Sequence, residues 1–343
     1  MKRVKSFIKS LLTLCVIVLG SLLNATPKLD DLLHDMQHYK TTSRHRGNLY
    51  EHSIWAEQYI SRWAIEDCRE SFWLRGISER NRYLLAVTCL LHDIGKAGAI
   101  DDSFYEAYER VDEVIYYYTR YKHERIGFEY IMHDLHPELD CYRQYCLFDG
   151  CTIVDMKSIL ESLSIDDREE QHLVAFLIGT HKLFTSMLNQ IADKYSWRID
   201  YQSFWQTVTS LADESTCPLT QELIEMMLAI GIADYHATFY PLESPTVSLV
   251  LGNPIYCVSP HPFINEQARI DRYSRLVFPV ARYLRMKLLN QFNSQMYQQG
   301  VGISQNKIMF LLQCAGMLIN EWLPTINFTL IHGHQKTAQD QVA

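Results

Sequence analysis

The chain has 343 residues, of which 48% are hydrophobic and 12% are aromatic, and its formal net charge at pH 7 is −8. This composition can bury a substantial core in one or two domains and excludes a disordered chain. The acidic balance argues against broad nucleic-acid binding, because basic surfaces supply most of the affinity for nucleic acids. We therefore expect a globular protein whose partners are not nucleic acids in general.

The first 25 residues have the features of a leader. Four basic side chains precede an apolar run at 11–23, and Leu23-Asn24-Ala25 offers a signal-peptidase site. The run is short for a transmembrane span, which favours a signal peptide over a membrane anchor. We expect an exported or membrane-associated protein with possible N-terminal membrane contact, and a cytoplasmic location is less favoured. Removal of this segment takes the net charge from −8 to −12.

Helical periodicity begins near residue 49. His52, Tyr59 and Trp63 fall on one helical stripe, so His52 is expected to face the core. Shortly before this helix, Arg44 and Arg46 are candidates for binding a substrate phosphate, because a guanidinium group can donate two parallel hydrogen bonds to phosphate oxygens. The alternative is that these arginines simply face water.

The segment His92-Asp93-Ile94-Gly95-Lys96 closes an apolar run at 83–91. The run has the spacing of a buried helix, so His92 and Asp93 lie at its C-terminal end, where Gly95 can stop it. A site that combines an imidazole ligand with a carboxylate ligand is suited to binding Fe, Mn, Zn or Mg. Lys96 can contact a substrate phosphate as a point charge. Taken alone, the pair would more commonly cap the helix or form a salt bridge, and Lys96 would be a surface lysine.

Three further predicted helices turn a metal-type side chain toward the core. His123 shares a helix face with Gly127, which allows a neighbouring helix to approach closely. His181 ends an apolar stripe at 173–181. Asp234 lies on the core face of a helix that includes residues 223–234. A buried aspartate is rarely left unpaired. Each histidine alone would more often be a hydrogen-bonded core residue, but the series predicts one shared metal site.

The order of these side chains resembles that of the HD-domain metal-dependent phosphohydrolase superfamily. The resemblance covers about residues 44–236, and its most specific part is Leu-Leu-His-Asp-Ile-Gly-Lys. It implies an all-α, HD-domain-like helical bundle and one or two divalent metal ions. The implied metal ligands are His52, His92, Asp93, His123, His181 and Asp234. The chain departs from this pattern because Lys182, not a second histidine, follows His181. It also lacks the Gly-Tyr-Pro element of the members that cleave cyclic dinucleotides.

The resemblance implies hydrolysis of a phosphate ester, either a nucleotide or another phosphorylated small molecule, by metal-activated hydroxide. Asp93 and Lys96 are then the catalytic candidates, with Asp93 bridging two ions. The first ion would be completed by His52, His92 and Asp234, and the second by His123 and His181. Two divalent ions and two carboxylates leave a charge of about +2, which suits a phosphate. No general acid is identified, although Glu124 and His133 are near in sequence.

Three other functions stay open on the same residues. A mononuclear phosphomonoesterase would use the first four ligands alone, with His123 and His181 contacting the substrate. A sensor would keep the HD fold and bind a phosphorylated ligand without turnover. A dinuclear-iron oxygenase is the third alternative, because related helical folds use His and Asp ligands for oxidation.

The chain is expected to be helical almost throughout. Residues 26–240 are expected to form the HD-like domain, and residues 241–343 a C-terminal helical extension. The extension would hold a helix at 263–292 interrupted near Pro279 and another at 307–322, while 141–152, 162–167 and 241–262 would be loops.

Nine cysteines become eight if Cys15 is removed with the leader, an even number that permits disulfides in an exported protein. Cys89 lies on the buried helix before the doublet and is expected to pack as a small hydrophobe. Cys141, Cys146 and Cys151 are evenly spaced near His133 and are compatible with disulfides or a structural zinc site.

Overall fold

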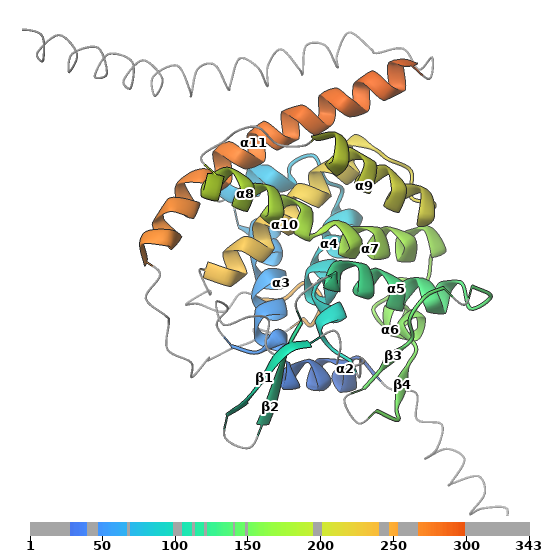
Figure 1. The fold of residues 1–343 in the computed structure, drawn as a ribbon. Helices are drawn as coiled ribbons and strands as arrows, with labels where there is room; N and C mark the ends of the chain where they lie inside the picture. Colours follow the sequence, from blue (N-terminus) through green and yellow to red (C-terminus); the bar gives the residue numbers. More distant parts are fainter. Residues whose placement is uncertain are drawn as a thin grey trace, which may run out of the picture.

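The computed structural model describes residues 28–39, 47–66, 69–98, 105–111, 114–119, 122–139, 141–147, 150–194, 201–239, 247–252 and 267–298. These residues are mostly helical (Figure 1), as the sequence predicts. The predicted leader, Arg44, Arg46 and the predicted helix at 307–322 lie outside the described residues.

Five helices form the centre of the fold. They are α3 (Leu49–Ile65), α4 (Glu79–Leu91), α5 (His123–Leu135), α7 (Arg168–Thr180) and α10 (Gln221–Phe239). Helix α3 packs on α4 and α10, and α7 packs on α4 and α5. Three of these helices are capped at the N-terminus by a short polar side chain. The side chains of Asn48, Ser78 and Asp167 accept hydrogen bonds from backbone N–H groups in the first turns of α3, α4 and α7. Such caps satisfy donors that have no partner within the helix.

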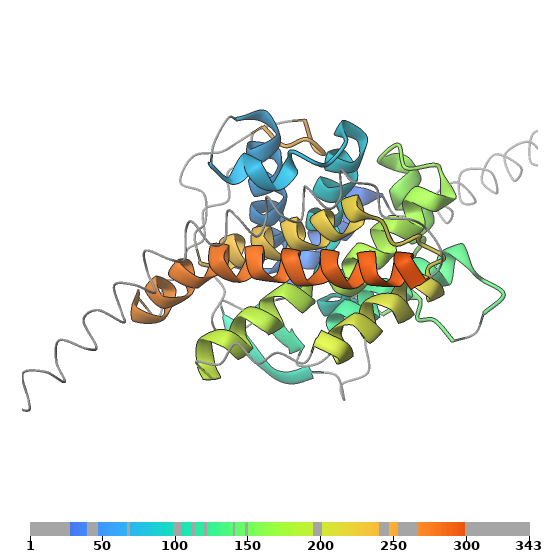
Figure 2. The ribbon, with the colours of Figure 1, turned by 90° about the horizontal axis from the view of Figure 1, so that it is seen from above.

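Other helices surround this centre. They are α2 (Leu29–Asp35), α6 (Met156–Ser162), α8 (Lys182–Lys194), α9 (Tyr201–Glu214) and α11 (Gln267–Gln298), with 3₁₀ turns at Met36–His38, Arg69–Leu74 and Ile94–Lys96. Figure 2 shows α11 lying across one side of the protein beside α10. The sequence predicts an interruption at Pro279, but α11 is continuous through that residue. The predicted loop at 162–167 lies between α6 and α7.

Strands occur where the sequence analysis expects helix. Strand β1 (Tyr105–Val111) pairs antiparallel with β2 (Val114–Thr119), and this hairpin projects from the helices in Figure 1. Valine, isoleucine and tyrosine fit a pleated strand well, which explains why this aromatic segment is not helical. Two very short strands, β3 (Tyr145–Cys146) and β4 (Ile153–Val154), pair within and just after the predicted loop at 141–152.

None of the helices in the described ranges combines the length and the apolar character needed to cross a bilayer.

Candidate metal centre

Two histidines of the centre occupy the same position at the end of a helix. His92 follows the last residue of α4, and His181 follows the last residue of α7. Carbonyl groups in the last turn of a helix lack helical donors. The His92 Nδ1–H donates to the Cys89 carbonyl over 2.6 Å, and the His181 Nδ1–H donates to the Ile178 carbonyl over 2.7 Å. In the neutral ring, each Nε2 therefore carries the lone pair.

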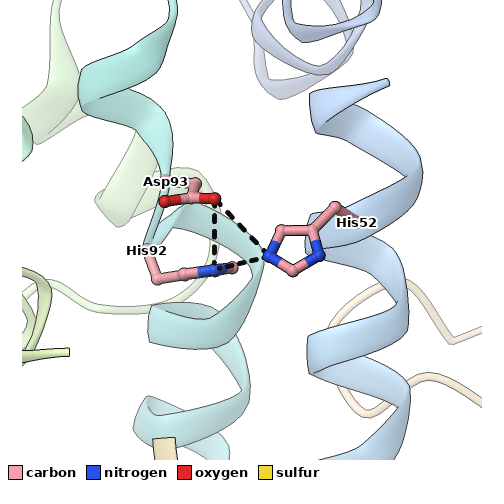
Figure 3. A group of neighbouring side chains, drawn as sticks. All are labelled: His52, His92 and Asp93. Atoms are coloured by element: carbon pink, nitrogen blue, oxygen red, sulfur yellow. Dashed lines mark hydrogen bonds and ion pairs between the residues drawn. The ribbon is translucent and has the colours of Figure 1, made fainter. Parts of the chain in front are cut away.

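The first ligand group consists of the Nε2 atoms of His52 and His92 and Oδ2 of Asp93, and Oδ1 of Asp234 lies beside its two histidines. Figure 3 shows the His52 ring of α3 facing His92 and Asp93 at the end of α4. The two Nε2 atoms are 3.3 Å apart, and each lies 3.5 Å from Asp93 Oδ2. Asp234 Oδ1 of α10 lies 3.0 Å from His52 Nε2 and 3.5 Å from His92 Nε2. Three helices thus meet at one point.

The second ligand group consists of Oδ1 of Asp93 and the Nε2 atoms of His123 and His181. Asp93 Oδ1 lies 3.0 Å from His123 Nε2 and 3.4 Å from His181 Nε2. Asp93 therefore presents one carboxylate oxygen to each group, which places a single carboxylate between two pairs of histidines.

Glycines allow the two groups to lie this close. A Cβ on Gly95 would lie 1.9 Å from the His123 carbonyl oxygen and 2.6 Å from the Gly127 nitrogen. The 3₁₀ turn that follows the doublet therefore packs backbone against backbone on the first turns of α5. Gly95 lies within this turn and α4 has already ended at Leu91, so the expectation that Gly95 stops the helix is wrong. The expected close approach at Gly127 is confirmed, because a Cβ there would lie 2.8 Å from Ile178 Cγ2.

The separations in both groups match the edges of a metal coordination shell. Nitrogen and oxygen ligands lie about 2.1 Å from Zn²⁺, so neighbouring ligands are about 3.0 Å apart in an octahedron and about 3.4 Å apart in a tetrahedron. The separations given above run from 3.0 to 3.5 Å. The lone pair of neutral His92 Nε2 also faces carboxylate oxygens, which only accept hydrogen bonds. A cation, either a proton on the ring or a metal ion, is needed between such atoms.

Both carboxyl groups of the centre have a pKa well below the usual value of aspartic acid. Burial alone would raise the pKa of Asp93, but the positive charges of Lys96 and His92 outweigh it. Burial would likewise raise the pKa of Asp234, but the hydrogen bond from His52 and the positive charge of protonated His92 outweigh it. Both aspartates are therefore ionised at neutral pH, as metal ligands must be.

The histidine rings respond differently to the same surroundings. Burial lowers the pKa of His52, although the hydrogen bond with Asp234 opposes this change. Burial lowers the pKa of His123 well below its usual value, and the charge of Lys96 lowers it further. Burial would also lower the pKa of His92, but Asp93 and Asp234 outweigh it and raise that pKa. His52 and His123 are thus neutral imidazoles at pH 7, the form that binds metal.

Lys96 lies inside the centre. Its ammonium is 2.5 Å from Asp93 Oδ2, and the whole residue is only 5% exposed. This is a buried ion pair, which the sequence did not indicate, because a lysine after a glycine usually lies on the surface. The positive charge compensates one of the two buried carboxylates.

The six predicted metal ligands are all buried: the four histidines contact Asp93, and Asp234 contacts His52 and His92. The predicted substrate-binding Arg44 and Arg46 lie outside the described residues. Thr185, which is not among the predicted site residues, donates its hydroxyl hydrogen to Asp234 Oδ2 over 3.3 Å. Its position one turn after His181 was the available signal. Glu124 lies beside His123, while His133 pairs with Asp134 and takes no part in the centre.

The alternative of a structural zinc site at Cys141, Cys146 and Cys151 finds no support within the described part of the chain. Cys141 is an exposed free thiol, and neither it nor Cys146 or Cys151 belongs to a group of side chains there that can hold a metal. Cys89 is fully buried with a free thiol, as expected for a small hydrophobe, and burial raises its pKa well above the usual value.

Comparisons with protein-family models, with curated proteins and with solved structures find no match for this chain.

Proposed function

We propose that this protein is a metal-dependent hydrolase of phosphate esters that binds two divalent ions. The observation that carries the proposal is the position of Asp93, which offers Oδ2 to His52 and His92 and Oδ1 to His123 and His181. A carboxylate shared by two histidine pairs is suited to bridging two cations. The resemblance of the ligand order to HD-domain phosphohydrolases supports the same function.

With two divalent ions bound, the charge of the centre would favour an anionic substrate. Asp93 and Asp234 contribute two negative charges, Lys96 contributes one positive charge, and the neutral histidines contribute none, so the side chains sum to −1 and two divalent ions would bring the centre to about +3. Divalent ions, when bound, would polarise a phosphoryl group and make water more acidic. The chain itself holds the ligands in place: the Cys89 and Ile178 carbonyls orient the rings of His92 and His181, and Lys96 keeps Asp93 ionised.

An activity screen tests the proposal. The full chain is loaded in turn with Mn, Fe, Zn or Mg and assayed on an aryl phosphate, an aryl phosphodiester and a nucleotide panel. We expect phosphate or alcohol release with at least one metal. The variants His92→Ala and Asp93→Ala should lose about 1,000-fold or more, because bound metal supplies several kcal/mol of transition-state stabilisation. His34→Ala, at an exposed histidine of α2, should retain activity.

Other results would assign a different function. Tight binding of one phosphorylated compound without release of product would favour a sensor. Iron-dependent oxygen uptake without phosphate release would favour an oxygenase. Equal activity of the wild type and Asp93→Ala would show that the centre is not the active site.

A further inference from the structure

Two charged side chains mark the place where the second ligand group meets solvent. The side chains of His123, His181 and Asp93 are 6%, 1% and 1% exposed, whereas those of Glu124 and Lys182 are 27% and 38% exposed. Glu124 directly follows His123, and Lys182 directly follows His181. These two residues, called here the rim pair, therefore join the buried second group to the surface.

The rim pair is loosely associated. Lys182 Nζ lies 3.9 Å from Glu124 Oε2, which in turn lies 3.7 Å from His123 Nδ1. Neither separation is a hydrogen bond, and an ion pair this long and this exposed contributes little stability. The Glu124 Oε2 atom is itself buried and has no hydrogen-bond partner among the described residues. The Lys182 ammonium makes no hydrogen bond to Glu124 at this distance, so it can turn toward another anion without breaking one.

The first turn of α8 contacts a neighbour of each ligand group. Lys182 and Thr185 are three residues apart, so they lie on the same side of the helix. Lys182 reaches Glu124 beside the second group, and Thr185 donates to Asp234 beside the first group. Gly231 permits this arrangement, because a Cβ there would lie 2.4 Å from the Cβ of Phe184. One turn of α8 thus lies along the whole centre.

We propose that Lys182 binds the anionic group of the substrate as it enters the centre, in exchange for its contact with Glu124. This inference rests on the proposed function and deepens it, because it names the cation that selects a phosphate-bearing substrate. Lysine suits the role, since its flexible stem carries a point charge that can follow an anion. The exposed position of Lys182 distinguishes it from Lys96, which is held inside the centre by Asp93.

Steady-state kinetics of Lys182→Ala test the inference in the metal-loaded full chain. We expect KM for the aryl phosphate to rise about tenfold, equivalent to about 1.4 kcal/mol, with kcat changed less than about twofold. Lys182→Arg should recover part of the affinity. Lys157→Ala is the matched control, because Lys157 also lies on the surface in a long ion pair, 3.8 Å from Glu161. Its KM should equal that of the wild type.

Two further measurements separate this inference from the proposed function. Binding of inorganic phosphate to the metal-loaded proteins is measured by calorimetry, which needs no turnover, and should weaken about tenfold in Lys182→Ala. Metal content should stay unchanged. Equal phosphate affinity in Lys182→Ala and wild type overturns the role of Lys182 even if the enzyme is active. A loss of metal in Lys182→Ala also overturns it, because the residue would then support the centre and not the substrate.

Discussion

At the scale of single residues, the position of the Asp93 carboxylate between the two ligand groups predicts how many metal ions each variant binds. Asp93 has one oxygen in each ligand group, whereas His181 belongs only to the second. We expect about two ions per wild-type chain, about one in His181→Ala, and none retained in Asp93→Asn, because ligand loss removes the site it completes. Mass spectrometry of native protein and elemental analysis measure the content. Retention of two ions by Asp93→Asn would contradict the bridging position.

A second residue-scale prediction concerns acid stability. His172 is buried against the His136 ring, with 3.2 Å between the Nε2 atoms, and contacts the Thr216 hydroxyl. Burial, together with the charges of His136 and Arg168, lowers the pKa of His172 to about 4. Between pH 6.5 and about 4, the unfolded chain therefore binds more protons at His172 than the folded chain does. The stability that neutral His172 contributes is present above pH 6.5 and is lost as the pH falls through this window.

Replacing His172 with glutamine should reduce this acid sensitivity, since glutamine does not titrate and can keep the contact with Thr216. Allowing for screening by solvent, we expect the loss of unfolding free energy between pH 7 and pH 4 to be smaller by about 1 kcal/mol in His172→Gln. Urea unfolding at a series of pH values measures it. Parallel curves for the two proteins would rule out this contribution.

At the scale of elements, the contact between the 3₁₀ turn Ile94–Lys96 and α5 sets the distance between Asp93 and His123. In Gly95→Ala the new methyl group would meet two backbone atoms, which cannot rotate away as a side chain can. We expect a loss of about 2 to 3 kcal/mol of stability from overpacking, and weaker binding of the second ion. Gly76→Ala is the control, because a Cβ there meets nothing within 4 Å. Urea unfolding and metal titration compare the two; equal values would show that the turn can shift freely.

The same elements show what the sequence could reveal. Each central helix repeats apolar residues at helical spacing, and this pattern placed His52, His123 and Asp234 on buried faces correctly. The pattern could not show that Asp93 points its two oxygens at different histidines, because that depends on how helices cross. Nor could it show that Gly95 serves close packing, since its contact is with α5, about thirty residues away in the chain. The hairpin at 105–119 was missed although Val114, Ile115 and Tyr116 favour strands.

At the scale of the whole molecule, the centre depends on distant parts of the chain. His52 and Asp234 are separated by 182 positions and lie 3.0 Å apart. Helix α10, which carries Asp234, packs on α3 on one side and on α11 on another. Helix α11 therefore supports the helix that places Asp234 beside the first ligand group, although α11 supplies no predicted ligand.

Helix α11 is anchored by burial and by an ion pair. Its buried apolar side chains include Val280, Leu284 and Leu288. The Arg285 Nε lies 2.7 Å from both carboxylate oxygens of Glu225 on α10. Each large apolar side chain buried contributes about 1.5 to 3 kcal/mol, so several together rival the whole stability of a domain, about 5 to 15 kcal/mol.

A chain that ends at residue 240 lacks α11 and should therefore aggregate or melt far below the full chain. Within the full chain, Arg285→Ala should cost about 3 kcal/mol, because it leaves the Glu225 carboxylate buried without its partner. Lys287→Ala, at an exposed position of the same helix, should change stability by less than about 0.5 kcal/mol. Thermal and urea unfolding measure these three variants beside the full chain. A stable, metal-binding chain of 240 residues would show instead that the centre folds without α11, and that residues 241–343 are a separate extension.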